Sequence, residues 1–256
     1  MRLLEKSALV TGAGGGLGSA IARCLAAEGA SVICTDRDQT KVQLTVENIC
    51  QNGGTAKAFT ADIEKASDCD AQVEETVRSY GRIDILVNNA GIALHQLAIE
   101  TRLEDWQRVL NINLTGSFLT AKAAAKHMAK QRSGHIIQIG SISGQLGNMG
   151  GVAYGASKAA IMHACKVLAV ELSSLGVMVN AIAPGPIETG ISIHGPTRKQ
   201  AHLDRIPTRQ HGSVEAVANA VLFLASDQST WITGHVLNVD GGYGTAGVIY
   251  DSTEIN

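Results

Sequence analysis

Three polar side chains in the second half of the sequence could together move a proton to or from an oxygen atom. Tyr154 and Lys158 are four residues apart, so on a helix they share one face. A nearby ammonium group favours a phenolate and lowers the ordinary phenol pKa of about 10. Ser141 follows a run typical of a strand, and its hydroxyl could hydrogen-bond the same substrate oxygen. These residues predict acid–base chemistry at a carbonyl or alcohol, with Tyr154 as the proton shuttle.

A glycine-rich segment near the beginning predicts a dinucleotide site. Residues 11–18 lie between the first apolar run and the first helical pattern, the order in which such loops bind a pyrophosphate. The next apolar run ends at Asp36, roughly 20 residues beyond the glycines. A carboxylate there accepts hydrogen bonds from the ribose 2′-OH of NAD and repels the 2′-phosphate of NADP, so we expect NAD rather than NADP. The adjacent Arg37 leaves NADP open, because a guanidinium could contact a phosphate or stack on adenine.

Short apolar runs alternate with helical patterns along the whole chain, which is typical of β-α-β units. The runs are continuous rather than alternating, as strands buried on both faces of a parallel sheet require. Between two of them, Leu17, Ile21 and Leu25 recur at the spacing of a core-facing helix. We therefore predict a Rossmann-type α/β fold, a doubly wound seven-stranded parallel sheet with helices on both faces. The predicted strands are residues 7–10, 31–35, 55–60, 83–87, 135–139, 177–182 and 235–239.

No linker or repeat divides the chain, so we expect one domain over residues 1–256. Its cofactor half is about residues 1–130, and its catalytic and substrate half is about residues 131–256. All four prolines of the chain lie between Pro184 and Pro207. Such a long irregular stretch is more often functional than accidental, and we interpret residues 185–207 as a lid over the active site.

The composition argues against several classes of partner. The net charge is -2 and no basic cluster is present, so neither nucleic acid nor a membrane surface is expected to bind. The sequence shows no secretory signal and no apolar segment near the ~20 residues needed to span a bilayer. The five cysteines are scattered without a C-x-x-C pair, which indicates free thiols in a reducing, cytoplasmic compartment. The eight histidines lack a ligand spacing, so no protein-bound metal is predicted.

Several motifs occur together in one order, and through them the chain resembles the short-chain dehydrogenase/reductase family. The resemblance extends from Ser7 to about Gly242 and favours its NAD-preferring secondary-alcohol or polyol dehydrogenase branch. The motifs are T-G-x-x-x-G-x-G at residues 11–18, Asn88-Asn89-Ala90-Gly91, Ser141 with Tyr154-x-x-x-Lys158, and Pro184-Gly185 followed by Thr189.

This resemblance implies specific roles. Asn113 would hold a water in a proton relay to Lys158, and it is preferred over the nearby Asn111 because Leu-Thr-Gly follows it. The implied catalytic residues are Asn113, Ser141, Tyr154 and Lys158. The implied cofactor contacts are Gly12, Gly14, Gly15, Gly16, Leu17, Gly18, Asp36, Arg37, Asp62, Ile63, Asn89, Ala90, Gly91, Tyr154, Lys158, Pro184, Gly185, Ile187 and Thr189. The candidate substrate contacts are Ser141, Gln145, Tyr154, His95 and His194.

The lid suggests the kind of substrate. It offers few large apolar side chains but several basic ones, among them Arg198 and His202, which favours a small polar molecule. The leading interpretation is an NAD-dependent oxidoreductase that interconverts a small polar secondary alcohol and its ketone. One alternative is a 3-oxoacyl thioester (acyl-carrier-protein) reductase, a branch whose members usually use NADPH. Another is a catalytically silent NAD-binding scaffold, which retention of Tyr154 and Lys158 disfavours.

The resemblance also implies a homotetramer. In this family it is built largely from the helices that here contain residues 113–130 and 154–175. The first helix is rich in alanine, which would let helices approach closely, although an alanine-rich face also suits a core. The tail, residues 244–256, is a candidate contact with a neighbouring subunit.

Overall fold

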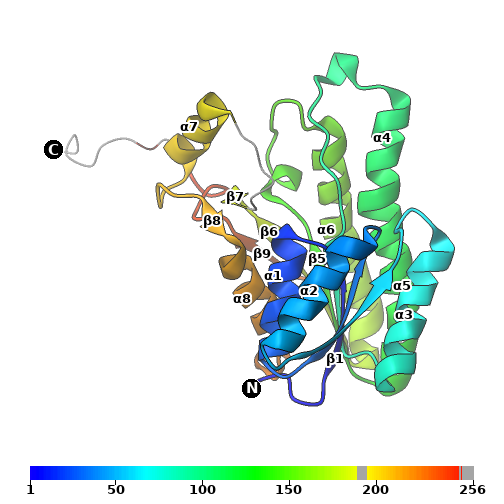
Figure 1. Ribbon diagram of the computed structural model, residues 1–256. Helices are drawn as coiled ribbons and strands as arrows, with labels where there is room; N and C mark the ends of the chain where they lie inside the picture. The colour runs from blue at the N-terminus through cyan, green and yellow to red at the C-terminus, as the bar shows by residue number, and fades with distance from the viewer. Residues whose placement is uncertain (189–194, 248, 250–256) are drawn as a thin grey trace.

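The computed structural model describes residues 1–188, 195–247 and 249. Seven parallel strands form its central sheet in the order β3-β2-β1-β4-β5-β6-β9 (Figure 1). The prediction of a doubly wound seven-stranded parallel sheet in one Rossmann-like domain is confirmed. The strands are β1 (Ser7–Thr11), β2 (Ser31–Asp36), β3 (Thr55–Thr60), β4 (Ile85–Asn88), β5 (Gly134–Ile139), β6 (Val177–Pro184) and β9 (Val236–Val239).

Helices cover both faces of the sheet, because every central strand is apolar on both sides. On one face α1, α2 and α8 bury residues such as Ile21, Val46 and Val221 against the sheet. On the other face α3, α5 and α6 bury residues such as Met128 and Cys165. None of the helices in the described part of the chain is long and apolar enough to cross a membrane. The helices are α1 (Gly16–Ala27), α2 (Gln39–Gln51), α3 (Ala66–Tyr80), α4 (Leu103–Leu110), α5 (Ser117–Gln131), α6 (Val152–Leu172) and α8 (Val214–Ala225).

The strand order creates a crevice beside β1. The chain first runs outward through β2 and β3, then returns to pair β4 with the opposite edge of β1. Connections that leave β1 and β4 therefore diverge to opposite sides at the carboxyl edge of the sheet. Such a switch point is where open α/β sheets bind ligands.

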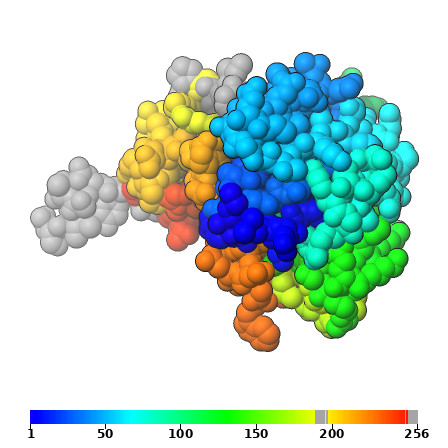
Figure 2. Space-filling view, turned by 60° about the horizontal axis from the view of Figure 1, so that its bottom comes forward, coloured from blue at the N-terminus to red at the C-terminus, as the bar shows by residue number. Residues whose placement is uncertain are grey.

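The region predicted as an irregular lid contains regular structure that the sequence did not indicate. Helix α7 (Pro196–Arg205) has a proline in its first turn, where the fixed φ of proline suits a helix start. Two-residue strands β7 (Ile187–Glu188) and β8 (Gly212–Ser213) pair beneath it, too short to leave a periodic signal. Figure 1 shows α7 standing apart from the other helices, and Figure 2 shows this yellow-to-orange region beside the blue N-terminal half.

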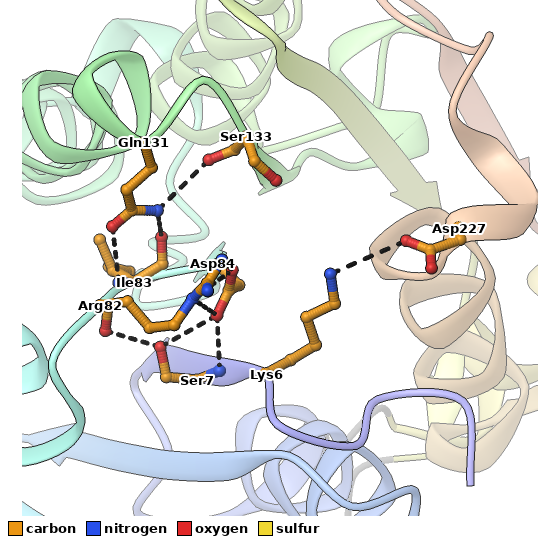
Figure 3. A network of polar contacts seen from close by, with 8 residues as sticks. All are labelled: Lys6, Ser7, Arg82, Ile83, Asp84, Gln131, Ser133 and Asp227. Carbon is orange, nitrogen blue, oxygen red and sulfur yellow. Dashed lines mark hydrogen bonds and ion pairs between the residues drawn. The ribbon is translucent and has the colours of Figure 1, made fainter.

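A network of polar contacts lies at the opposite edge of the sheet, where the strands begin, and connects the segments there (Figure 3). The Asp84 carboxylate accepts a hydrogen bond from the Ser7 backbone N–H at 2.9 Å and from Arg82 Nε at 2.8 Å. Gln131, at the end of α5, exchanges hydrogen bonds with the Ile83 backbone. Asp84 therefore joins the start of β1 to the segment that leads into β4.

We predict that Asp84→Ala destabilises the protein by about 2–3 kcal/mol, because it leaves a buried N–H at Ser7 and the charge of Arg82 without their acceptor. Urea unfolding followed by circular dichroism measures the change. Asp227→Ala is the matched control: Asp227 is 79% exposed and lies 3.9 Å from Lys6, so a loss below about 0.5 kcal/mol is expected. Equal losses in the two variants would contradict the assignment.

Candidate active site

A cavity of about 740 Å³ lies at the carboxyl edge of the sheet. Its lining comes from segments that follow all seven strands of the central sheet, together with residues of α6 and α7. Three regions far apart in the sequence thus meet there: the glycine-rich loop, the segment after β4, and the residues Ser141, Tyr154 and Lys158. A pocket of this size can enclose a cofactor and a substrate together.

The glycine-rich loop is shaped for an anion. Gly12 has φ +65°, and a Cβ there would lie 2.8 Å from the Ala90 Cα, so both backbone and space require glycine. A Cβ at Gly18 would collide with the carbonyl oxygen of Gly12, which explains the close approach of helix and loop. Helix α1 begins with no side-chain cap at Gly15, and a Cβ at Gly15 would meet nothing within 4 Å. Open helix N–H groups beside free space fit a pyrophosphate.

The segment after β4 is tied directly to this loop. The Thr11 hydroxyl oxygen accepts hydrogen bonds from the backbone N–H groups of Asn89 and Ala90, each at 3.0 Å. The Asn89 amide nitrogen in turn donates to the carbonyl oxygens of Thr11 and Gly12 at 3.0 and 3.1 Å. The position of one cofactor-lining segment therefore fixes the position of the other.

Asp36 lies at the end of β2, but its carboxylate is already engaged. One oxygen accepts a hydrogen bond from the Gly14 N–H at 3.1 Å, and the other accepts one from the Asp38 N–H at 3.0 Å. Two cationic residues, Arg37 and Lys41, line the same end of the cavity. The carboxylate thus supports the glycine-rich loop, and it lies beside the positive charges of Arg37 and Lys41.

Lys158 is buried beside the pocket. Its ammonium nitrogen donates to the Ile139 carbonyl oxygen at 2.7 Å and lies 5.7 Å from the centre of the Tyr154 ring. Burial disfavours the charged form and lowers the pKa of Lys158 to about 8. The Lys158 side chain therefore changes charge close to neutral pH.

Tyr154 lies at the first turn of α6, and Ser141 lies two residues beyond the end of β5. Both line the cavity. Burial raises the pKa of Tyr154, while the adjacent Ser141 hydroxyl acts in the opposite direction. The spacing of Tyr154 and Lys158 predicted a lowered pKa for the phenol, but in the folded chain the loss of water around the phenol dominates and raises it. The phenol is therefore protonated at neutral pH and suited to donate a proton.

Asn113 is buried beneath the pocket in a π-helical turn, Asn111–Gly116, between α4 and α5. Its amide oxygen accepts from the Ile92 N–H at 2.8 Å, and its amide nitrogen donates to the Ile92 carbonyl and to the Ser157 hydroxyl. Both N–H donors are thus occupied, and one oxygen lone pair remains for a water. These contacts join the segment after β4 to α6, next to Lys158.

The predicted cofactor contacts gather in one place. All of them line the cavity except Thr189, which lies outside the described residues. Of the candidate substrate contacts, His95 lines the cavity and His194 lies outside the described residues. Gln145 does not line it: its amide forms a reciprocal pair with the Asn238 amide at 2.8 and 3.0 Å. Its amide is consumed by this pair, so the structure gives Gln145 a bracing role in place of the predicted substrate contact.

Several residues that line the cavity were not predicted as site residues from the sequence. Tyr243 lies after β9, more than 80 residues from Tyr154, and no spacing rule connects the two. Asn148 and Ser143 follow Ser141 closely in the sequence, and that proximity was a usable signal. Arg198 and His202 were noted only as basic lid residues, and their i, i+4 spacing on α7 could have indicated a shared face.

A dinucleotide cradle beside a serine, a tyrosine and a lysine in a doubly wound sheet defines a nicotinamide-dependent oxidoreductase. A family model described as enoyl-(acyl carrier protein) reductase matches residues 12–244. The chain is 43% identical to a 3-oxoacyl-[acyl-carrier-protein] reductase of Synechocystis sp. over 242 residues, covering 94% of this chain and 97% of the relative. It is 40% identical to the enzyme of the same description from Thermotoga maritima, covering 94% and 99%.

Solved structures agree with these matches. A short-chain type dehydrogenase/reductase from Mycobacterium ulcerans superposes with a TM-score of 0.93 at 30% identity, covering 100% of this chain and 95% of that one. The chain belongs to the short-chain dehydrogenase/reductase family.

The relatives correct the expected cofactor. They are 3-oxoacyl-[acyl-carrier-protein] reductases, the NADPH-dependent branch, so the expectation that NAD is preferred over NADP is wrong. The physical reason lies at Asp36. The prediction rested on repulsion between this carboxylate and a 2′-phosphate, whereas Arg37 and Lys41 line the same end of the cavity and offset that repulsion.

Burial of Lys158 carries a stability cost that a neutral side chain should relieve. The folded-state pKa of about 8 lies below the ordinary value of 10.5, so the unfolded chain binds the extra proton between these values and stability rises with pH across that window. We predict that Lys158→Met is inactive yet more stable at pH 7, by up to ~3 kcal/mol, and that this gain shrinks above pH 8.

Melting temperatures of the variant and the wild type at several pH values measure the difference. The control, Lys122→Met, replaces an exposed lysine of α5 and should show no pH-dependent gain. A constant difference between Lys158→Met and wild type across this range would mean that Lys158 keeps an ordinary pKa.

Proposed function

We propose that this protein is an NADPH-dependent reductase of 3-oxoacyl thioesters, with the acyl group presented on acyl carrier protein. The observation that carries the proposal is the pairing of Ser141 with a protonated Tyr154 at one end of the cofactor cavity. Two hydroxyls directed at one carbonyl oxygen suit reduction, because that oxygen gains negative charge and then a proton. The 3-oxoacyl relatives supply the substrate class.

Ser141, Tyr154 and Lys158 have different roles in this reduction. Ser141 donates a hydrogen bond to the 3-oxo oxygen, and Tyr154 gives its proton to the same oxygen as the alcohol forms. The neighbouring Lys158 ammonium stabilises the phenolate that remains, until a proton from solvent restores the phenol. NADPH, when bound, supplies the hydride for the carbonyl carbon. The thioester group itself is unchanged.

The NADPH preference has support from charge. Arg37 and Lys41 line the cavity near the end of β2, where a ribose phosphate would add two negative charges. Lys41 lies 3.4 Å from Asp38, while Arg37 has no acidic partner within 4.0 Å among the described residues. Arg37 is therefore our candidate for the phosphate contact.

Other functions are less well supported. A small polar secondary alcohol remains compatible with the basic lid, but the curated relatives named above act on thioesters. Reduction of an enoyl thioester is suggested only by the description of the matching family model. A silent cofactor-binding scaffold is disfavoured because Ser141, Tyr154 and Lys158 all line or border one cavity.

We predict that the wild-type protein reduces acetoacetyl-acyl carrier protein, with a higher rate for NADPH than for NADH. Tyr154→Phe should lower turnover at least ~100-fold while NADPH still binds, because the proton donor is lost and the cavity is kept. Loss of NADPH absorbance measures the rate and fluorescence titration measures binding. Tyr80→Phe is the control, since Tyr80 lies on α3 and is absent from the cavity lining. Faster turnover of crotonyl thioester or of polyols would overturn the 3-oxoacyl assignment.

We further propose a homotetramer in the cytoplasm. The alanines of α5, which the sequence offered as a helix contact, are used inside the chain: Ala121 and Ala124 are fully buried in its own core. The support comes instead from exposed apolar residues on the outer faces of α5 and α6, namely Phe118, Val167 and Val170. The five free thiols fit a reducing compartment.

We predict that Val170→Glu lowers the oligomeric mass, because it places a charge where an apolar surface is expected to be covered. Val170 is 82% exposed in the single chain, so the substitution should leave the fold intact. Light scattering at micromolar concentration gives the mass, and circular dichroism checks the fold. A wild-type monomer would rule out the tetramer.

A further inference from the structure

One cation that lines the cavity has no acidic partner among the described residues. Arg198 lies on α7 and lines the cavity, yet it makes no ion pair with any acidic residue in the described part of the chain. The neighbouring cations of α7 are engaged. Lys199 pairs with Glu188 at 3.2 Å, and the Arg205 guanidinium lies 5.0 Å from the centre of the Tyr243 ring. Arg198 therefore brings to the cavity a positive charge that no acidic side chain of the described residues neutralises.

The position of α7 places this charge on the catalytic side. Ile206, just beyond the helix, packs with Tyr243 and with Ile142, the residue after the catalytic Ser141. His202 follows Arg198 by four residues, and its ring lies 6.1 Å from that of Tyr243. The face of α7 that carries Arg198 thus borders the substrate end of the cavity.

The carboxylates of the described lining lie at the cofactor end of the cavity, away from Arg198. Among its described lining residues the only carboxylates are Asp36, Asp38 and Asp62, which follow β2 and β3. The sheet order puts β2 and β3 on one side of β1, and β5, which leads to Ser141, on the other. The substrate end therefore presents donors and a cation with no carboxylate from the described lining.

His95 adds a neutral donor beside Arg198. Partial burial, and then the nearby Arg198 charge, lower the pKa of His95, so its ring is uncharged at neutral pH. A neutral imidazole can hydrogen-bond an anion held by the guanidinium. Asn148, which also lines the cavity, supplies a further amide.

We propose that Arg198, assisted by His95, binds an anionic group of the substrate and makes the enzyme selective for negatively charged 3-oxoacyl thioesters. This inference rests on the proposed function and names the substrate class of the same site. Guanidinium groups bind carboxylates and phosphates in the same bidentate geometry, so the anion has two chemical sources. It is either a carboxylate on the acyl chain or the phosphate of the phosphopantetheine arm.

Three thioesters distinguish these sources. Acetoacetyl-N-acetylcysteamine is neutral, the N-acetylcysteamine monothioester of 3-oxoadipate adds a carboxylate, and acetoacetyl-phosphopantetheine adds a phosphate. Each is assayed with NADPH on the wild type, on Arg198→Gln and on Lys199→Gln. Lys199 is the control because it is the neighbouring cation on α7 and does not line the cavity.

Wild-type enzyme should prefer one anionic thioester over the neutral one by about tenfold or more in kcat/KM, equivalent to ~1.4 kcal/mol. Arg198→Gln should remove that preference while kcat/KM for the neutral thioester stays within about twofold, and Arg198→Lys should restore part of it. Lys199→Gln should behave as wild type.

The outcomes separate this inference from the proposed function. Turnover of the neutral thioester without any preference for an anion would overturn the role of Arg198 and leave the reductase assignment intact. Equal loss on all three substrates, with a raised KM for NADPH, would assign Arg198 to the cofactor and overturn the inference. Failure of the wild type to reduce any of the three would overturn both proposals.

Discussion

Hydrogen bonds between the end of β1 and the segment after β4 hold the site together. Thr11 and Asn89 exchange donors and acceptors across the switch point, where the chain diverges to the two halves of the sheet. The glycine-rich loop belongs to one half, and Ser141, Tyr154 and Lys158 belong to the other. A crevice opens between diverging segments only if their first residues are fixed, and these contacts fix them. Asn113 continues the same chain of contacts from Ile92 to α6.

Burial of a lysine is the second constraint. The sheet and α6 surround Lys158, and the Ile139 carbonyl is its hydrogen-bond acceptor in the described structure. A buried ammonium is unfavourable for folding, yet it places positive charge next to the phenol of Tyr154. The same shortage of water raises the pKa of Tyr154 and keeps it protonated. Stability and acid chemistry at this site thus have one physical origin.

The substrate side is assembled from the end of the chain. Tyr243 and Ile206 pack on Ile142, and Gln145 pairs with Asn238 beside them. These contacts connect α7 and the segment after β9 to the segment that carries Ser141. A molecule bound under α7 would therefore touch a surface whose parts also support the segment that carries Ser141, so its binding would be coupled to the position of that hydroxyl.

The sequence by itself determined the strands, the sheet class and the residues of the cofactor loop. The signals for these features are local: continuous apolar runs, four-residue spacing such as Leu17 to Ile21, and the glycines of residues 11–18. Such short-range patterns can be recognised in the sequence without the fold. The sequence did not determine which nicotinamide cofactor is preferred, because the charge around Asp36 includes Lys41 of α2, which only the folded state brings to the same end of the cavity. It also did not determine the roles of Gln145, Tyr243 and Arg198. Gln145 pairs with Asn238 of β9, Tyr243 packs on Ile142 and Ile206, and Arg198 lines the same cavity as Tyr154. Only the tertiary structure brings such distant groups together.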